Sequence, residues 1–323
     1  MAPTKSIRKT NSNLIRREHM SGEIIEKIAT LKRQRRAVVL AHNYQIGEVQ
    51  DIADFTGDSL GLSIEASKTD AATIVFCGVR FMAETAAILS PDKTVLLPDA
   101  TAGCPMADMI DAKQLADLKK RHPNALVVCY VNTTAEVKAL SDYCCTSSNA
   151  LQLVRRLPED REIIFVPDRN LGQYIIDQTG RDMILWPGYC LTHARITTEE
   201  VAAARAKFPD AVVMSHPECS SEVRAASDEL LSTGQMLKFA GMSDYRRFIV
   251  VTEVGIIHSL KKACPDKTFI PVSDAAACRN MKKITLEKVL WSLEDMQYRI
   301  TVPEDVRVRA RLSLDRMLEV TPT

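Results

Sequence analysis

Short apolar runs alternate with longer segments of helical periodicity over most of this 323-residue chain. The first runs, at 37–42, 73–78 and 94–100, are rich in β-branched residues, which is typical of buried strands. Apolar residues at helical spacing fill the segments between these runs and a further segment at 22–35. Strands that alternate with helices in this way predict parallel sheets of the Rossmann-like type.

The same order of elements returns twice further along the chain. The later strands are predicted at 125–132, 161–170 and 182–190, and then at 211–218, 247–255 and 268–278. Each set of three ends at or just before one cysteine, and Cys104, Cys190 and Cys278 recur after 86 and 88 residues. A period of this size corresponds to one small α/β unit and is well above the periods of solenoid repeats.

Two further columns of residues share this period, within the connection that follows the first strand of each set. Aspartates occupy one column and hydroxyl residues the other: Asp54, Asp142 and Asp228, and Ser59, Ser147 and Thr233. The repeated aspartates favour a structural cap over a catalytic role. The shared period predicts an α/β fold of three homologous Rossmann-like α/β/α domains with pseudo-threefold symmetry around a central active site.

We place these domains at residues 1–108, 109–193 and 194–323. The first domain includes a basic N-terminal tail, and the third includes two closing helices, which the helical spacing after Cys278 predicts on either side of Pro303. No Gly/Ser-rich linker separates the domains.

Composition excludes several classes of protein. The chain is 46% hydrophobic and 26% charged, with 42 Lys and Arg against 41 Asp and Glu, so no basic excess points to nucleic acid. No run approaches the roughly 18 apolar residues of a membrane span, and the first 20 residues lack the apolar core of a secretory signal. Nine cysteines in such a chain do not indicate a disulfide framework. We therefore expect a cytoplasmic enzyme.

Polar side chains follow the first strand of each set. They are His42, Asn43 and Tyr44, then Tyr130 and Asn132, then His216 and Glu218. Ligands of open α/β sheets gather at the carboxyl ends of the strands, so these side chains are expected around one cavity. The hydroxyl column lies just ahead of helical segments, where backbone N–H groups favour anions. The expected ligand is therefore small, polar and acidic.

The three periodic cysteines are brought together only by the repeat, because none of them lies in a CxxC motif. Three thiolates on a [4Fe–4S] cluster leave one iron without a protein ligand. Such an open metal position is typical of a Lewis acid that assists loss of water.

Several strings of residues resemble the quinolinate synthase family. They are AHNYQ at 41–45, GDS at 57–59, FCGVRFMAETAAILSP at 76–91, PDATAGCPMAD at 98–108, YVNTTAEVKA at 130–139, PDRNLG at 167–172, PGYCLTH at 187–193, HPEC at 216–219, TEVG at 252–255 and CRNMKKITLEK at 278–288. The resemblance runs from about residue 37 to 290. It implies three Rossmann-like domains around a central site, in agreement with the repeat.

The resemblance also implies an activity. Enzymes of that family condense iminoaspartate with dihydroxyacetone phosphate to quinolinate, with loss of phosphate and two waters, on a [4Fe–4S] cluster. The implied cluster ligands are Cys104, Cys190 and Cys278. The implied substrate contacts are His42, Tyr44, Ser59, Tyr130, Asn132, Ser147, His216, Glu218 and Thr233. Some relatives carry CxxCxxC at the third ligand, whereas Cys278 is alone here, which does not support a redox switch in that run.

Roles within this set are hypotheses. Glu218 is expected to be the general base, because partial burial can raise the pKa of a carboxylate toward neutral pH. Tyr44 and His42 would assist proton transfer. An aspartate oxidase or dehydrogenase that supplies iminoaspartate is a possible transient partner. The sequence leaves open whether His193, Glu84 and Glu253 contact the site.

Two other classes of function are alternatives to this enzyme. A non-enzymatic iron–sulfur or zinc protein that senses redox state would not need the polar residues at the strand ends. A cluster-free nucleotide-binding enzyme would be expected to carry GxGxxG after a first strand, and this chain does not.

Overall fold

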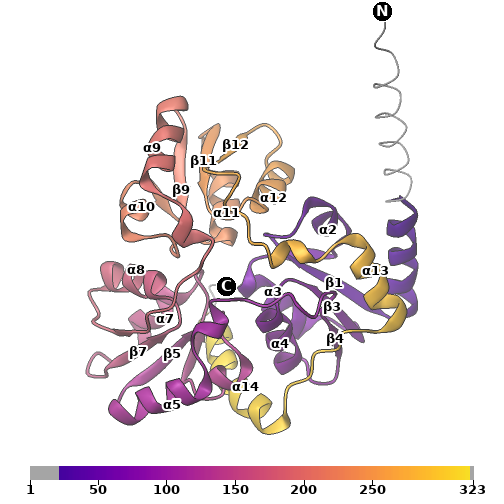
Figure 1. The fold of residues 1–323 in the computed structure, drawn as a ribbon, viewed down its shortest axis with the longest axis horizontal. Coiled ribbons are helices and arrows are strands. Elements are labelled where there is room, and N and C mark those ends of the chain that lie inside the picture. The colour runs from indigo at the N-terminus through magenta and orange to yellow at the C-terminus, as the bar shows by residue number, and fades with distance from the viewer. Residues whose placement is uncertain (1–21, 321–323) are drawn as a thin grey trace, which may run out of the picture.

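Residues 22–320 are described in the computed structural model of the protein, and they form three separate parallel sheets of four strands each (Figure 1). The basic N-terminal tail of the sequence prediction lies outside this range. Residues 22–34 are helical, close to the predicted 22–35. Each sheet with its connecting helices is called a unit below, in chain order.

The first unit contains β1 (Ala37–His42), β2 (Phe55–Gly57), β3 (Thr73–Cys77) and β4 (Thr94–Leu96), with α2 (Gly47–Ile52), α3 (Ser59–Lys68) and α4 (Arg80–Leu89). The second contains β5 (Leu126–Tyr130), β6 (Tyr143–Cys145), β7 (Ile163–Val166) and β8 (Ile184–Leu185), with α5 (Ala112–Arg121), α6 (Ala135–Lys138), α7 (Ala150–Arg156) and α8 (Arg169–Thr179). The third contains β9 (Val212–Ser215), β10 (Glu229–Leu230), β11 (Arg247–Val251) and β12 (Thr268–Pro271), with α9 (Thr198–Lys207), α10 (Ser221–Ala225), α11 (Thr233–Met242) and α12 (Ile256–Ala263).

The three sheets share one topology. Their strand orders are β2-β1-β3-β4, β6-β5-β7-β8 and β10-β9-β11-β12. Every residue of β3, β7 and β9 is buried, which explains why these strands appear in the sequence as unbroken apolar runs. The predicted α/β class and the repeated Rossmann-like topology are therefore confirmed, whereas the boundaries at residues 108 and 193 stay predictions.

One strand in each unit was not predicted. β2, β6 and β10 are edge strands of two or three residues, and each lies inside the connection that the sequence indicated as helical. Strands this short carry too few residues for an alternating pattern to be visible. Several other strands end earlier than predicted, since β4 stops at Leu96 and β7 at Val166.

The repeated aspartates hold these edge strands to the sheet. In each unit, a carboxylate oxygen accepts a hydrogen bond of 2.7–2.8 Å from a backbone N–H of the first strand, and the aspartate's own N–H donates to the carbonyl of the same residue. The pairs are Asp54 with Val39, Asp142 with Val127, and Asp228 with Val213. The predicted role as a repeated structural cap is confirmed, and the groups that the carboxylates cap are backbone N–H groups of strands.

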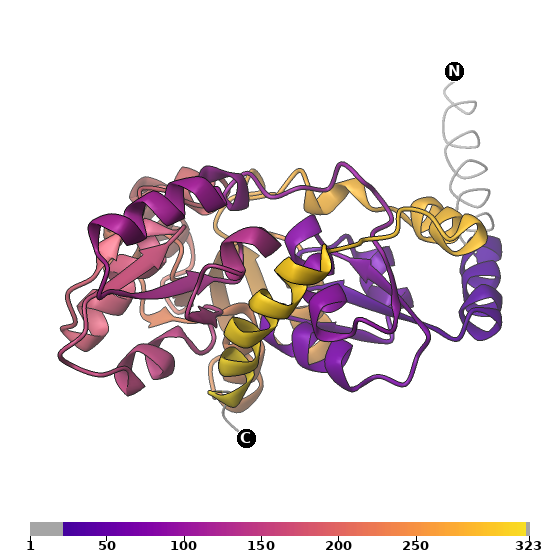
Figure 2. The same cartoon turned by 90° about the horizontal axis from the view of Figure 1, so that it is seen from below.

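The chain closes with α13 (Leu286–Asp295) and α14 (Glu304–Glu319). α13 packs near β3, and α14 contacts α4 of the first unit and both α6 and β6 of the second. Figure 2 shows α14, in yellow, crossing between these two units. Within residues 22–320, no helix has the length and apolar character needed to cross a bilayer.

Candidate active site

A cavity of about 350 Å³ lies between the three units. Its lining includes Cys104, Cys190 and Cys278, together with every residue that the sequence placed near a substrate: His42, Tyr44, Ser59, Tyr130, Asn132, Ser147, His216, Glu218 and Thr233. These residues come from three separate sheets, so the fold gathers side chains that are far apart in the sequence.

The parallel strands explain this gathering. His42 and Tyr130 are the last residues of β1 and β5, and His216 directly follows β9. Two positions further along each loop lie Tyr44, Asn132 and Glu218. Equivalent positions at the carboxyl end of the first strand therefore carry different side chains in the three units.

The two histidines of this group are held in one tautomer. Nδ1 of His42 accepts the backbone N–H of Tyr44 at 3.1 Å, and Nδ1 of His216 accepts the backbone N–H of Glu218 at 3.3 Å. Burial, together with the neighbouring His216 ring, lowers the pKa of His42 to about 3. Burial also lowers the pKa of His216 to about 3. Both rings are therefore neutral near pH 7, with the proton on Nε2.

Each cavity cysteine occupies the same local structure. Cys104, Cys190 and Cys278 stand three residues before the short 3₁₀ helices η1 (Ala107–Met109), η2 (His193–Arg195) and η3 (Met281–Lys283). Burial raises the pKa of all three thiols, that of Cys104 to about 12, while backbone hydrogen bonds from the 3₁₀ turns oppose the rise. Donors aimed at the sulfurs favour thiolates, the form that binds metals.

Two buried carboxylates hold two of the cysteine loops. Oδ2 of Asp168 accepts the backbone N–H of Cys190 at 3.1 Å, and Oε1 of Glu253 accepts that of Cys278 at 2.9 Å. Glu253 also forms an ion pair of 2.9 Å with Lys282. Both carboxylates are fully buried, and these contacts fix the positions of the loops.

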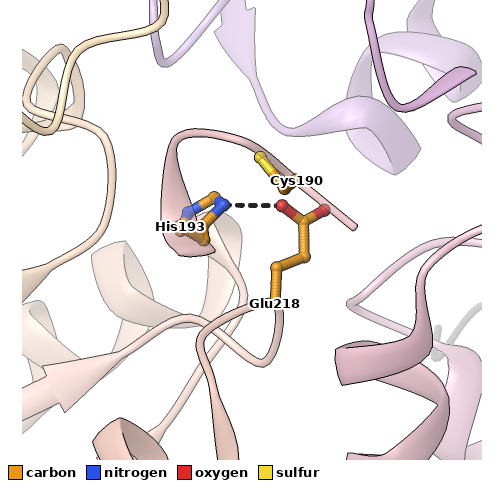
Figure 3. A group of neighbouring side chains, drawn as sticks. All are labelled: Cys190, His193 and Glu218. Atoms are coloured by element: carbon orange, nitrogen blue, oxygen red, sulfur yellow. Dashed lines mark ion pairs between the residues drawn. The ribbon is translucent and has the colours of Figure 1, made fainter. Parts of the chain in front are cut away.

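A continuous series of side-chain contacts crosses the cavity wall. The hydroxyl of Tyr44 lies 2.6 Å from Oγ1 of Thr252, which lies 2.7 Å from Nε2 of His193. Nδ1 of His193 lies 2.7 Å from Oε2 of Glu218 (Figure 3), and Tyr130 donates to Oε1 of Glu218 at 2.5 Å. The series joins the first, third and second units, and each contact is short enough to pass a proton.

The electrostatics of this series differ from the sequence expectation. Burial alone would raise the pKa of Glu218, but His193, His216 and the Tyr130 hydroxyl outweigh it and hold that pKa below its ordinary value. Burial and the charge of Glu218 raise the pKa of Tyr130 well above its ordinary range. Glu218 is therefore ionised and Tyr130 protonated near neutral pH, and the predicted rise in the pKa of Glu218 is wrong.

Helix N-termini meet at one side of the cavity. Asp58 and Ser232 cap α3 and α11, and Ser148 lies just ahead of α7. The Ser148 hydroxyl donates to Oδ2 of Asp58 at 2.5 Å and lies 2.8 Å from the Ser232 hydroxyl. One residue from each unit thus forms this junction.

The hydroxyl column lies beside this junction. Ser59 and Thr233 are the first residues of α3 and α11, while Ser147 precedes the cap of α7 by two residues and lies 3.2 Å from Nε2 of His216. Two of the three hydroxyls are therefore inside the first helical turn rather than ahead of it.

The structure shows which of the three residues left open by the sequence line the cavity. His193 and Glu253 line the cavity, whereas Glu84 does not; it pairs with Arg80 and accepts the backbone N–H of Ala135. Sequence reasoning missed Thr252, Arg195 and Arg279. Thr252 directly follows β11, a position that was a usable signal, whereas the two exposed arginines of the lining had none.

Comparison with known proteins gives one consistent result. A family model described as "Quinolinate synthetase A protein" matches residues 26–319. The chain is 56% identical to a quinolinate synthase of Dehalococcoides mccartyi over 297 residues, which cover 92% of this chain and 98% of the relative. It is 54% identical to that of Geotalea uraniireducens and 53% identical to that of Methanosarcina barkeri, each over 92% of this chain and 98% of the relative.

Proposed function

Since this chain belongs to the quinolinate synthase family, we propose that its cavity condenses iminoaspartate with dihydroxyacetone phosphate to quinolinate, with loss of phosphate and two waters. This reaction would supply the pyridine ring for NAD biosynthesis. The observation that carries the proposal is the cavity lining, in which three cysteines and nine polar residues singled out from the sequence come together from three sheets.

We further propose that Cys104, Cys190 and Cys278 hold a [4Fe–4S] cluster. A single tetrahedral metal ion would need the sulfurs about 3.8 Å apart, given metal–sulfur bonds of about 2.3 Å. Among residues 22–320, however, the three sulfurs do not form a group within 4.8 Å. This wider spacing fits a cluster of several irons better than one ion. When bound by three cysteines, the cluster would supply an open iron as a Lewis acid for dehydration.

The helix N-termini at the cavity suit the negative charges of the substrates. Both substrates are anions, with two carboxylates on iminoaspartate and a phosphate on the triose. The hydroxyls of Ser59, Ser147 and Thr233 lie where helix N-termini meet, and such positions stabilise anions. Neutral His42 and His216 would add Nε2–H donors that do not depend on pH near neutrality. Tyr44, Tyr130, Asn132 and Glu218 are the other expected substrate contacts.

The series of contacts from Tyr44 to Tyr130 would move protons. Several carbons must exchange protons during triose isomerisation and ring closure, so more than one acid–base group is required. Ionised Glu218 can accept a proton and would act as the general base, and Tyr130 can donate a proton. Thr252 would connect His193 to Tyr44, so that both ends of the series reach the cavity.

We also propose a cytoplasmic location and a transient contact with an aspartate oxidase or dehydrogenase. A reducing compartment would protect the cluster and its thiolates. Imines hydrolyse in water, so direct delivery from the enzyme that makes iminoaspartate would limit its loss.

Anaerobic reconstitution of the full chain with iron and sulfide tests the proposal. We expect a brown protein with about four irons per chain that forms quinolinate from dihydroxyacetone phosphate and iminoaspartate made in situ, detected by mass spectrometry. A reconstituted, iron-loaded protein that consumes neither substrate would contradict the proposed reaction. A folded protein that takes up no iron would contradict the proposed cluster.

A further inference from the structure

Three donor atoms of different chemistry lie together on one wall of the cavity. A sulfur of Cys190, a ring nitrogen of His193 and a carboxylate oxygen of Glu218 all lie within 4.8 Å of one another (Figure 3). Within residues 22–320, no other three His, Cys, Asp or Glu residues meet this condition. The spacing is that of ligands of one metal ion after small side-chain shifts, rather than of a multi-iron cluster.

His193 is oriented as a metal ligand. Its Nε2 is held by Oγ1 of Thr252 at 2.7 Å, and its side chain is 1% exposed. Its Nδ1 lies 2.7 Å from Oε2 of Glu218 and has no other partner among residues 22–320. A histidine ligand usually has its second nitrogen fixed in this way, which leaves the first free for the ion.

The other two ligands are fixed as well. Tyr130 donates to Oε1 of Glu218, which leaves Oε2 for an ion, and Asp168 accepts the backbone N–H of Cys190. Zn²⁺ prefers sulfur, imidazole and carboxylate ligands, and three protein ligands would leave one position for water. One thiolate and one carboxylate would neutralise the dication, which offsets the desolvation cost of burying the ion.

We propose that the cluster-free protein binds one Zn²⁺ ion through Cys190, His193 and Glu218. The Cys190 thiol loses its proton to solvent as the sulfur–zinc bond forms, while Nδ1 of His193 and Oε2 of Glu218 each donate a lone pair. No electron is transferred. Cys190 is also a ligand of the proposed cluster, so zinc and the cluster exclude each other. This exclusion rests on the proposed function. Zinc would thus hold the enzyme inactive until iron and sulfide are supplied.

Titration of the cluster-free full chain with Co²⁺, a coloured probe of zinc sites, tests the metal site. We expect one equivalent to bind and to give a sulfur-to-cobalt charge-transfer band with the strong visible absorption of tetrahedral cobalt. Cys190→Ser should remove the charge-transfer band, and His193→Ala should remove tight binding. Thr252→Ala, which touches no metal, should weaken binding by about 10- to 100-fold.

Cys104→Ser and Cys278→Ser are the matched controls, because both residues line the same cavity but lie outside the proposed zinc set. Both should bind Co²⁺ like the parent chain. Loss of the band in Cys104→Ser with its retention in Cys190→Ser would overturn the assignment, as would the absence of stoichiometric binding in a chain with parent-like circular dichroism. These outcomes are read without cluster or substrate, so they are distinct from a failure to make quinolinate.

Competition tests the mutual exclusion. Preloading with one equivalent of Zn²⁺ should block iron uptake by the parent chain, and His193→Ala should take up iron regardless of zinc. Equal iron uptake by the parent chain with and without bound zinc would overturn the exclusion.

Discussion

The hydroxyl of Tyr130 donates a hydrogen bond of 2.5 Å to Oε1 of Glu218. Tyr130 ends β5 of the second unit, and Glu218 lies in the loop after β9 of the third. Both side chains are buried, so this contact joins two units and stabilises an ionised carboxylate within the cavity wall. The chemistry and the assembly of the site therefore depend on the same pair.

Replacing Tyr130 by Phe tests this pair. Loss of the hydroxyl removes a proton donor and leaves Oε1 of Glu218 without its partner. We expect kcat to fall by about 10²- to 10⁴-fold and the free energy of unfolding to fall by about 1–3 kcal/mol. Steady-state kinetics and thermal unfolding measure the two effects. Tyr143→Phe is the control, because that ring stacks with Arg316 and does not line the cavity. Unchanged kcat in Tyr130→Phe would contradict the proton-transfer role.

We expect replacement of a repeated aspartate to lower stability without loss of function. Asp142→Ala removes the carboxylate that accepts the backbone N–H of Val127, which should lower the free energy of unfolding by about 1–2 kcal/mol. KM and kcat at permissive temperature should stay close to those of the parent chain, since Asp142 does not line the cavity. A large fall in kcat with unchanged thermal stability would mean that this column acts in catalysis.

Much of the fold was predictable because the same order of strands, helices and a closing cysteine occurs three times in the chain. The period of Cys104, Cys190 and Cys278 and the apolar strands between them gave the number of units and their order. The edge strands were not predictable, since β10 has only Glu229 and Leu230 and no pattern can be read from two residues. Backbone pairing and Asp228, not side-chain burial, define that strand.

The site was predictable where residues share the period and unpredictable where they do not. Ser59, Ser147 and Thr233 share it and line the cavity, as do the cysteines. Thr252 has no hydroxyl counterpart in the other units, so the period does not indicate it. Its place after β11 was the only sequence signal, and its contacts with Tyr44 and His193 show its role. The low pKa of Glu218 also depends on His193, which belongs to a different unit, and no local sequence pattern contains that information.

The buried histidines predict how stability depends on pH. The pKa values of His42 and His216 are lowered from 6.5 to about 3. Between pH 3 and 6.5 the unfolded chain therefore binds more protons than the folded one, and stability falls as the pH falls through this window. Each histidine should contribute a slope of about 1.4 kcal/mol per pH unit. Denaturant unfolding at several pH values measures the slope. His216→Asn should flatten it, and an unchanged slope would contradict the burial of a neutral ring.

The junction at Asp58 predicts an effect on binding. Asp58→Asn keeps the size of the side chain but weakens its bonds with Ser148 and with the N-terminus of α3. Because the hydroxyls beside this junction are proposed to hold substrate anions, KM should rise by about tenfold or more, for a loss of about 1.4 kcal/mol, with a smaller change in kcat. Asp117→Asn, on the exposed face of α5, is a suitable control. A change in kcat alone would place Asp58 in the chemical step.

Iron content and quinolinate formation in three cysteine variants test the central claim most directly. Cys104→Ser, Cys190→Ser and Cys278→Ser are reconstituted anaerobically beside the parent chain and Cys264→Ser, whose thiol is buried at the end of α12 outside the cavity. We predict that each of the three variants loses stable iron binding and quinolinate formation, while Cys264→Ser retains both. Full iron content together with parent-like quinolinate formation in any one of the three would contradict the account.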